Sequence, residues 1–233
     1  MNKGYLLNKS HWYTLWEVEI QDSPEEGIFK ITDKGKEEAG EILNIYSETI
    51  SSNGQIIYKR SGEMQRVEAH NIGALHAGAH IWVYNSKWQI LLQKRAKGIV
   101  SWWLLDVSVA WHILGGETVI SGGIRELWQE IGLIRNPEDL VLIWYYRKET
   151  IKETEEGIRH NNEIIKVFLL RYDGDIEDLI LQKSEVEKVK FISLKKLKKK
   201  WKNRKALTKY TTKSDEYLNM VLSNIKKVLW APQ

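Results

Sequence analysis

The chain has no cysteine in 233 residues, and it has only three prolines and three phenylalanines. Without cysteine, disulfide bonds and thiolate metal sites are excluded, which fits a reducing compartment. No apolar run reaches the roughly eighteen residues that a membrane-spanning helix needs, and residues 1–20 lack the apolar core and cleavage site of a signal peptide. These absences predict a cytoplasmic protein that has no membrane partner.

The remaining composition is that of a globular domain, with 42% hydrophobic residues, 28% charged residues and a formal net charge of +4. Much of the positive excess lies in residues 188–205, which would attract phosphate groups or nucleic acid. Leu194, Leu197 and Trp201 recur there at helical spacing, which favours a helix that packs one face and exposes its lysines to solvent. Nucleic acid is therefore the weaker of the two interpretations of this segment.

Acidic residues at helical spacing are the most informative feature of the chain. The pattern of residues 119–131 predicts a helix on which Glu126 and Glu130 lie on one face, with Gln129 beside them. Glu117 lies in the preceding loop. Carboxylate oxygens are the ligands that Mg²⁺ and Mn²⁺ prefer, and an unneutralised carboxylate pair on one face suits such an ion.

This segment resembles the Nudix box, the signature of a superfamily of diphosphate hydrolases. The matching positions are Glu117, Arg125, Glu126, Glu130 and Gly132. The resemblance implies an α/β fold, an α/β/α sandwich with a mixed β-sheet, and Mg²⁺- or Mn²⁺-dependent cleavage of a diphosphate linkage in a nucleoside diphosphate derivative or related small molecule. Two positions depart from it, because Trp111 stands where the box opens with glycine and Gln129 replaces the first of two adjacent glutamates. These departures predict weakened metal binding.

The resemblance also implies roles for the residues of the box. Glu126 and Glu130 are expected to bind the metal ion, with Gln129 as a weak neutral ligand and Glu117 completing the cluster. Arg125 is expected to pair with Glu117 and to hold the loop against the helix. Glu117, Arg125, Glu126 and Glu130 are thus the predicted catalytic residues.

Further candidates lie outside the box. Lys94 and Arg95 end a predicted strand and are candidates to contact the substrate phosphates. Glu163 and Glu185 are alternative candidates for the general base, which Nudix proteins often recruit from a later strand or loop. His112, directly after Trp111, is a further candidate to contact the substrate.

The segments 79–85, 89–95 and 106–112 are similar to the branch of the superfamily that includes isopentenyl-diphosphate isomerase, and the resemblance covers about residues 41–200. In that isomerase a cysteine acts as an acid/base on carbon, whereas this chain has Ala110 there. Hydrolysis is therefore favoured. An isomerase, a diphosphate or nucleotide sensor weakened at Gln129 and Trp111, and an RNA-end processing enzyme remain alternatives. The oligomeric state is open, and a homodimer is compatible with the sequence.

The order of patterned segments predicts the organisation of the chain. Residues 1–40 have no clear period and are expected to form an extension, residues 41–200 the Nudix domain with an N-terminal hairpin, and residues 201–233 a helical extension. The predicted strands are 42–50, 55–58, 79–84, 89–93, 140–147, 163–172 and 186–192, and the predicted later helices are 194–200 and 215–229. Asn53-Gly54 predicts a tight turn in the first hairpin.

Histidine spacing predicts no zinc site. His76 and His80 lie four residues apart and His112 stands alone, so no compact triplet such as HExxH is present. A single histidine is more often a hydrogen-bonded structural residue than a metal ligand.

Tryptophan is over-represented, with eleven residues in the chain. Several stand where a small residue would be expected, namely Trp88, Trp102, Trp103, Trp111, Trp128 and Trp144. One explanation is an aromatic pocket near Trp102 and Trp103. The other is that the codon at these positions means glycine in its source, since Trp88 falls in a hairpin turn that favours a positive φ.

Overall fold

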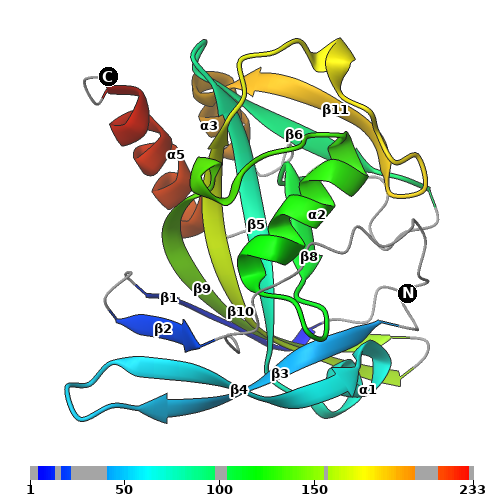
Figure 1. The fold of residues 1–233 in the computed structure, drawn as a ribbon, viewed down its shortest axis with the longest axis vertical. Helices are drawn as coiled ribbons and strands as arrows, with labels where there is room; N and C mark the ends of the chain where they lie inside the picture. Colours follow the sequence, from blue (N-terminus) through cyan, green and yellow to red (C-terminus); the bar gives the residue numbers. More distant parts are fainter. Residues whose placement is uncertain are drawn as a thin grey trace. The chain divides into compact units, whose positions relative to one another are not determined.

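A computed structural model describes residues 5–13, 17–21, 41–97, 104–154, 157–202 and 215–230 (Figure 1). The chain divides into two compact units, which are treated separately below. Unit 1 consists of Met1–Ala79, Trp111–Gly123 and Trp144–Val167, and unit 2 consists of His80–Ala110, Ile124–Ile143 and Phe168–Gln233. Strands β5, β8, β9 and β10 and helix α2 contribute residues to both units.

Unit 1 consists mainly of strands. Its elements, whole or in part, are β1 (Tyr5–Tyr13), β2 (Val18–Gln21), β3 (Ile42–Ile50), β4 (Ile56–Gln65), α1 (Arg66–Ile72), β5 (His76–Asn85), β8 (Val109–His112), α2 (Val119–Ile131), β9 (Val141–Thr154) and β10 (Gly157–Arg171). The hydrogen-bonded order is β1-β9-β10-β5-β3-β4-β2. β2 runs parallel to β4, whereas β1 pairs with β9 and β3 with β4 in the antiparallel sense. The predicted α/β class with a mixed sheet is confirmed.

The N-terminal segment, which was expected to form an extension without a clear period, contains two strands. It contributes β1, whose register pairs Tyr13 with Tyr145, and β2, which pairs Val18 with Ile56. Both strands add to existing strands of unit 1. A strand of this kind is specified by the hydrogen-bonding groups of its neighbour more than by its own period, which explains why the sequence pattern missed it.

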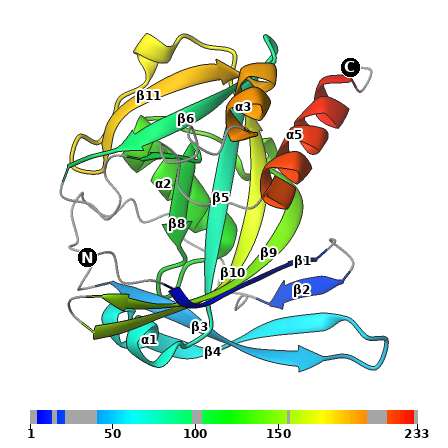
Figure 2. The same cartoon turned by 180° about the vertical axis from the view of Figure 1, so that it is seen from behind.

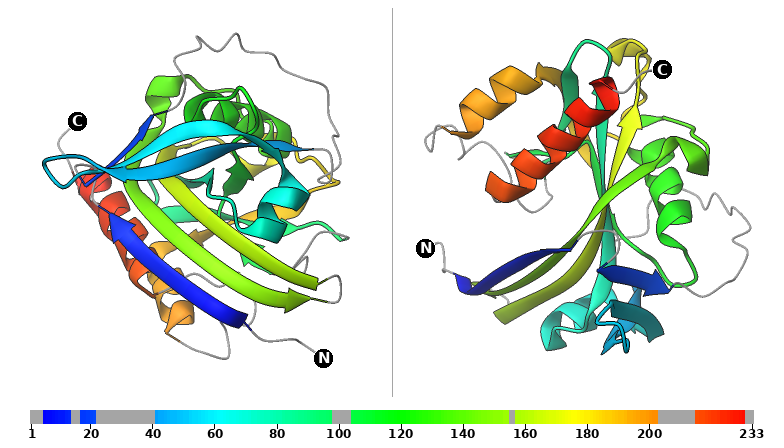
Figure 3. Two further views of the ribbon diagram at one scale, coloured as in Figure 1. Left: turned by 90° about the horizontal axis from the view of Figure 1, so that it is seen from below. Right: turned by 90° about the vertical axis from the view of Figure 1, so that its left-hand side faces the viewer.

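The hairpin β3–β4 forms as predicted, and the two strands run side by side in Figure 3. Its turn is closed by hydrogen bonds from the Gly54 and Ser51 amides to the carbonyls of Ser51 and Gln55. Gly54 has a φ of 84°, which a residue without Cβ adopts readily. Strand β4 is longer than expected, and α1 follows it directly.

Unit 2 contains the remaining elements. They are β6 (Gln89–Arg95), β7 (Leu105–Asp106), the 3₁₀ helices η2 (Pro137–Asp139) and η3 (Ile176–Asp178), β11 (Val186–Ser193), α3 (Leu194–Trp201) and α5 (Asp215–Trp230). β6 pairs antiparallel with β11, with β7 and with the end of β5. Figure 2 shows α3 continuing directly from the end of β11. The predicted strands 79–84, 89–93 and 186–192 and the helix 194–200 are confirmed within a few residues.

Helix α3, in the lysine-rich segment 188–205, packs one face and exposes its lysines to solvent, as predicted. Leu194, Leu197 and Trp201 are buried, and the intervening Lys195, Lys196, Lys198 and Lys199 are exposed. The Ser193 hydroxyl caps the helix by accepting a hydrogen bond from the Lys196 amide.

Helix α5 forms as predicted, one residue longer than the expected 215–229. Its buried residues are Tyr217, Leu218, Val221, Leu222 and Ile225. Val228, in the last turn, is 37% exposed. The Tyr217 hydroxyl accepts a hydrogen bond from the Trp82 indole and also contacts His80 Nδ1, both at 2.8 Å, so polar pairing with β5 helps to select the buried face. None of the helices described here is long and apolar enough to cross a membrane.

The turn between β5 and β6 contains Trp88, whose φ of 59° makes it the non-glycine residue with a positive φ in the described part of the chain. The expected left-handed position at residue 88 is therefore confirmed, and it is the conformation that glycine tolerates best. The indole packs edge-to-face against Trp230, with 5.4 Å between ring centroids. Trp111 and Trp144, by contrast, lie on strands and Trp128 lies on α2, while Trp102 and Trp103 lie outside the described residues.

Candidate functional site

Two groups of side chains bring together atoms that bind metal ions. The acidic cluster consists of Glu126, Glu130 and Glu185 and belongs to unit 2. The histidine cluster consists of His70, His76 and His112 and belongs to unit 1. Within each cluster the ligand atoms lie within 4.8 Å of one another.

The acidic cluster depends on helix α2, which has the predicted bounds Val119–Ile131. The Thr118 hydroxyl caps its first turn by accepting a hydrogen bond from the Ser121 amide. Leu127 and Ile131 are fully buried, and this apolar stripe orients the helix so that Glu126 and Glu130 share a neighbouring face.

Arg125 changes the charge that was expected on this face. Its Nη1 contacts Glu126 Oε1 and Gln129 Oε1, each at 2.7 Å. The sequence pattern alone suggested that no positive charge lies beside the carboxylate pair. The structure places the Arg125 guanidinium against it. Gln129 thus serves as an acceptor for Arg125, and its oxygen is already occupied by that hydrogen bond. The predicted pairing of Arg125 with Glu117 stays a prediction.

Glu130 is the most unusual carboxylate of unit 2. It is 4% exposed, and its Oε2 has no hydrogen-bond partner among the described residues. Burial raises the pKa of its carboxyl well above the usual range, the nearby Glu126 and Glu185 carboxylates raise it further, and the Arg95 guanidinium opposes them. A buried carboxylate oxygen without a partner is unfavourable, and a cation in contact with it would remove the penalty.

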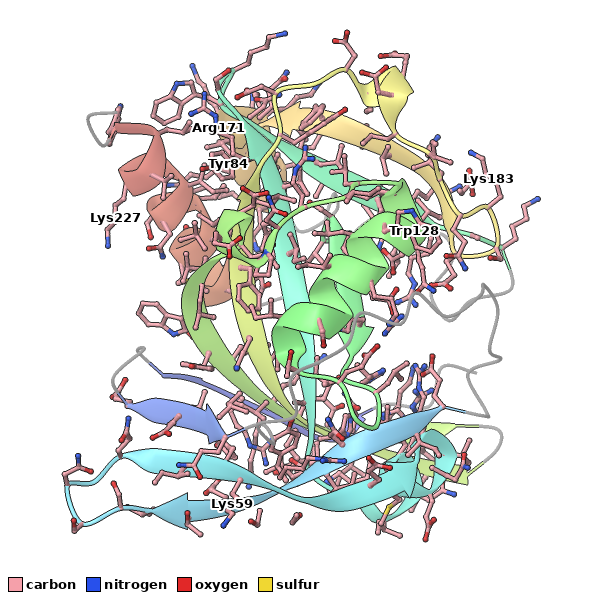
Figure 4. All side chains as sticks on the ribbon, viewed as in Figure 1. Lys59, Tyr84, Trp128, Arg171, Lys183 and Lys227 are labelled. Carbon is pink, nitrogen blue, oxygen red and sulfur yellow. The ribbon has the colours of Figure 1, made fainter. Side chains whose placement is uncertain are left out.

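Glu185 reaches the cluster because the loop before β11 is attached to the end of α2. The Gln182 amide donates to the Glu130 carbonyl at 3.0 Å, and the Gln182 side chain donates to Glu185 Oε1 at 2.9 Å. Figure 4 labels a side chain in each of the two segments, Trp128 on α2 and Lys183 in the loop. The sequence left Glu163 and Glu185 as equal candidates, and the structure places Glu185 beside the glutamates of the box.

Gly132 permits this attachment. Its φ of 73° ends α2, with the Gly132 amide donating to the Trp128 carbonyl. A Cβ at this position would lie 2.8 Å from Ile180 Cβ and 3.0 Å from the Ile180 amide nitrogen. Glycine is therefore required twice, by the backbone conformation and by the close approach of the loop that carries Glu185.

The loop before α2 belongs to unit 1. Glu117 Oε2 accepts a hydrogen bond from the Leu114 amide at 3.3 Å, and the Asn44 side chain donates to the Glu117 carbonyl at 2.9 Å. These contacts hold the loop in place through Glu117. The predicted role of Glu117 in metal binding is not tested by them.

Trp111 fills space in the same unit. It is 8% exposed, and a Cβ on Gly122 would lie 2.9 Å from its Nε1. That indole nitrogen is buried without a hydrogen-bond partner among the described residues. A buried indole normally finds an acceptor, so tryptophan is poorly matched to this position.

We expect Trp111→Gly combined with Gln129→Glu to raise Mg²⁺ affinity and kcat/KM by about tenfold, with Trp111→Gly responsible for most of the gain. Loss of a buried indole should at the same time lower the free energy of unfolding by about 3 kcal/mol. Mg²⁺-dependent phosphate release and thermal unfolding of the single and double variants measure the two effects. Trp144→Gly, which also removes a strand tryptophan with an unpaired buried indole nitrogen, is the control. A loss of activity in Trp111→Gly would mean that the indole belongs to the working site.

Lys94 and Arg95 lie in unit 2 at the end of β6. Lys94 Nζ binds both carboxylate oxygens of Glu187, at 2.8 Å and 2.6 Å, and so is held by an acidic side chain already. Arg95 Nη1 lies 3.7 Å from Asp106, and its side chain is 32% exposed. Arg95 is therefore the better placed of the two to meet an incoming phosphate.

The histidine cluster was not expected from spacing, because His70 is far in sequence from His112. His70 lies on α1, His76 begins β5 and His112 ends β8, and the three ring centroids lie 5.0 Å to 5.5 Å apart. Glu163 of β10 joins them, with Oε1 3.2 Å from His112 Nε2 and 3.9 Å from His76 Nε2. His112, predicted to contact the substrate, and Glu163, a candidate base, thus belong to the same group.

The protonation of the cluster follows from its contacts. His76 Nδ1 lies 2.9 Å from the Ala74 carbonyl, which can only accept, so the proton sits on Nδ1 and the buried Nε2 keeps its lone pair. Burial and the neighbouring His112 lower the pKa of His76 to about 4, and the same two causes lower the pKa of His70 to about 2. Burial acts to raise the pKa of Glu163, but the hydrogen bond and charge of His112 outweigh it and hold the pKa well below its usual range.

Comparison with known proteins agrees with the motif. A model described as NUDIX domain matches residues 74–211. Nudix hydrolase 3 of Arabidopsis thaliana is 32% identical over 147 residues, which cover 58% of this chain and 18% of that protein. An uncharacterised Nudix hydrolase of Clostridium acetobutylicum is 32% identical over 130 residues, which cover 54% of this chain and 60% of that protein.

An isopentenyl-diphosphate Delta-isomerase of Pectobacterium atrosepticum is 36% identical over 76 residues, which cover 32% of this chain and 42% of that protein. The chain therefore spans less than two thirds of the length of each of these three relatives.

Proposed function

Because the chain belongs to the Nudix family, we propose that it hydrolyses a diphosphate linkage in a nucleoside diphosphate derivative or related small molecule, with Mg²⁺ or Mn²⁺ as cofactor. The observation that carries the proposal is the acidic cluster, in which Glu126, Glu130 and Glu185 offer oxygens within 4.8 Å of one another. The buried, unpartnered Glu130 Oε2 fits a hard divalent cation. A cation bound there would neutralise charge on the diphosphate and lower the pKa of the attacking water.

The roles proposed for the individual residues are as follows. Glu126 and Glu130 hold the ion, and Arg125 keeps Glu126 and Gln129 in place through its two hydrogen bonds. Glu117 is proposed to complete the cluster from the preceding loop. Arg95 is proposed to contact the substrate phosphates, and Lys94 would have to leave Glu187 to do the same.

Glu185 is the proposed general base. Its Oε1 accepts a hydrogen bond from the Gln182 side chain, and the carboxylate is proposed to accept a proton from the attacking water. The water oxygen bonds to phosphorus, the bond from phosphorus to the bridging oxygen breaks, and the proton passes to Glu185. Glu163 is assigned a different role, since it accepts hydrogen bonds from Asn161 and His112 in the other unit.

We expect Glu185→Gln to lower kcat by about a hundredfold, because an amide cannot accept the proton. KM should change by less than about threefold, since the substrate phosphates are bound elsewhere. The acidic limb of the pH profile of kcat should disappear with the carboxylate. Glu177→Gln, on the exposed helix η3, is the matched control. A variant that keeps wild-type kcat would remove Glu185 from the mechanism.

The substrate class is tested by a panel of nucleoside diphosphates and triphosphates, dinucleotides, nucleotide sugars, coenzyme A and isoprenoid diphosphates with Mg²⁺. We expect release of phosphate or nucleoside monophosphate from at least one member. We expect no deuterium uptake from solvent into isopentenyl diphosphate, because Ala110 can neither give nor take a proton. Enzyme-dependent exchange above background would support the isomerase alternative, and tight binding without turnover would support the sensor alternative.

The histidine cluster supports a second proposal, that unit 1 binds a transition-metal ion. The three imidazoles of His70, His76 and His112 form a nitrogen ligand set, which differs from the all-carboxylate cluster of unit 2. The buried Nε2 of His76 has its lone pair free and its Nδ1 hydrogen-bonded to a carbonyl, as in many histidine ligands. Loss of high-affinity Zn²⁺ binding in His76→Ala tests it.

A further inference from the structure

Strand β3 continues its pairing onto the loop between β8 and α2, within unit 1. The Asn44 amide donates to the Ile113 carbonyl at 3.2 Å, and the Gly115 amide donates to the Ile42 carbonyl at 2.8 Å. The two bonds flank an isolated antiparallel bridge between the residues that lie inside them. This is the pattern of a regular antiparallel ladder, so the backbone of the loop is attached to β3 as a further strand would be.

The Asn44 side chain extends this attachment to the end of the loop. Its Nδ2 donates to the Glu117 carbonyl at 2.9 Å. Asn44 is 1% exposed, and its Oδ1 has no hydrogen-bond partner among the described residues. A buried amide oxygen without a partner is unfavourable, so stability alone does not explain asparagine at this position. An apolar residue of the same size would lack only one useful property, the donor to the Glu117 backbone.

Leu114 holds the same glutamate from within the loop. Glu117 Oε2 accepts a hydrogen bond from the Leu114 amide at 3.3 Å, and the Glu117 amide donates to the Leu114 carbonyl at 3.0 Å. Leu114 is itself bridged to Leu43 of β3. The backbone and the carboxylate of Glu117 are therefore both referred to one strand, and Asn44 supplies the side-chain contact.

Strand β4 covers the loop as well. Glu63 lies opposite Asn44 in the register of the hairpin and pairs with Arg60. A Cβ on Gly115 would lie 2.9 Å from Glu63 Cδ, so glycine is needed for this close approach. Both strands of the hairpin precede residue 74, where the match to the NUDIX domain model begins.

We propose that Asn44 is a positioning residue of the hydrolytic site, which sets the place of the Glu117 carboxylate by holding the Glu117 backbone against β3. The inference rests on the proposed function, in which Glu117 completes the acidic cluster. It makes the hairpin β3–β4 a functional part of the enzyme, although the hairpin lies outside the family match. The sequence pattern predicted a strand over residues 42–50 and gave Asn44 no role in it.

Asn44→Leu tests this role, because leucine has a similar size and cannot donate a hydrogen bond. We expect kcat to fall about tenfold and the Kd of Mg²⁺ to rise about tenfold, while KM changes less than about threefold. The Tm without Mg²⁺ should change by less than about 4 °C, because loss of the donor is offset by removal of the unpartnered Oδ1. Wild-type kcat and Mg²⁺ affinity in this variant would overturn the inference.

Hydrogen exchange of the metal-free protein reports the attachment independently of activity. The amides of residues 113–118 should exchange about tenfold faster in Asn44→Leu than in wild type, while those of β9 and β10 keep their wild-type rates. Asn44→Ala removes the donor without filling the space, and it replaces the leucine variant if that variant does not fold. Unchanged exchange of the loop in either folded variant would contradict the positioning role.

Asn162→Leu is the matched control. The Asn162 side chain also donates to a backbone carbonyl, that of Gly73 at 2.8 Å, and its Oδ1 is likewise buried without a partner among the described residues. The chemical change is the same, but the carbonyl belongs to a segment outside the Nudix box. We expect kcat and the Kd of Mg²⁺ to stay within about threefold of wild type. Losses equal to those of Asn44→Leu would show a general effect of removing a buried amide and would overturn the inference.

A double-mutant cycle decides whether Asn44 acts through Glu117. Once Glu117→Gln has removed the carboxylate, adding Asn44→Leu should lower kcat by less than about threefold more. A full further tenfold loss would mean that Asn44 acts elsewhere.

Glu126→Gln separates failure of this inference from failure of the proposed function. If Glu126→Gln and Glu117→Gln lose activity and Asn44→Leu does not, the proposed function stands and the inference is overturned. If Glu117→Gln keeps wild-type activity while Glu126→Gln loses it, the hydrolase stands and Asn44 has no catalytic group to position. Full activity in Glu126→Gln would remove the proposed metal site, and the inference with it.

Discussion

Glu130→Gln is expected to lower kcat/KM by at least about a hundredfold, because it replaces the buried carboxylate of the acidic cluster with an amide that supplies no charge to the cation. The same variant should not destabilise the metal-free protein. Burial already raises the pKa of Glu130 well above its usual range, so ionisation of this group opposes folding as the pH rises above the carboxyl's unfolded pKa. A neutral amide removes that penalty at neutral pH.

Two measurements separate these effects. Mg²⁺-dependent phosphate release should collapse in Glu130→Gln and in Glu126→Gln. We expect Mg²⁺ to raise the Tm of the wild-type protein but not that of Glu130→Gln, while the Tm of Glu130→Gln without Mg²⁺ stays level or rises. Glu138→Gln, on the exposed helix η2, is the control for a lost surface charge. Full activity of wild type in excess chelator would disprove the metal requirement, and full activity of both variants would disprove the residue assignment.

Gly132→Ala is expected to lower the free energy of unfolding by about 2–4 kcal/mol. A φ of 73° strains any residue with a Cβ by about 1 kcal/mol, and the added methyl group would meet Ile180 at 2.8 Å, an overpacking contact that adds about 1–3 kcal/mol. Relief of that contact would displace the loop that carries Glu185. Because the Gln182 amide of that loop donates to the Glu130 carbonyl, we also expect Mg²⁺ to bind about tenfold more weakly.

Gly54→Ala is the matched control for Gly132→Ala. Gly54 has a φ of 84°, but a Cβ there would have nothing within 4 Å, so only the backbone strain of about 1 kcal/mol applies. Denaturant unfolding and calorimetric titration with Mg²⁺ measure both outcomes. Equal losses of stability in the two variants would show that the Ile180 contact is not limiting. A destabilised Gly132→Ala with wild-type Mg²⁺ affinity would show that the loop that contains Ile180 does not help to position Glu130 for the ion.

Local patterns in the chain predicted the elements that depend on local physics. The helix expected over about residues 119–131 is confirmed as α2. Asn53-Gly54 marked the turn of the first hairpin, and position 88 was recognised as one that favours a positive φ. Helical periodicity, turn chemistry and backbone sterics act over a few neighbouring residues. Short stretches of the sequence are therefore enough to predict the elements that depend on them.

Pairing between segments that are distant in the sequence could not be predicted from such local patterns. β1 and β2 were missed because their partners, β9 and β4, supply the hydrogen bonds that define them. The pairing of Tyr217 on α5 with Trp82 and His80 likewise joins residues more than a hundred positions apart in the chain.

For the site, the sequence by itself determined the Nudix motif, the helix that presents Glu126 and Glu130, and the two departures at Trp111 and Gln129. Only the tertiary structure decided that Glu185 joins these glutamates, and that His70, His76 and His112 come together with Glu163 beside His112 and His76. The reason is that ligand groups of this kind need only a few side-chain atoms to converge. Their convergence depends on strand register and on the loop that packs against Gly132 and carries Glu185. Neither produces a periodic pattern in the sequence.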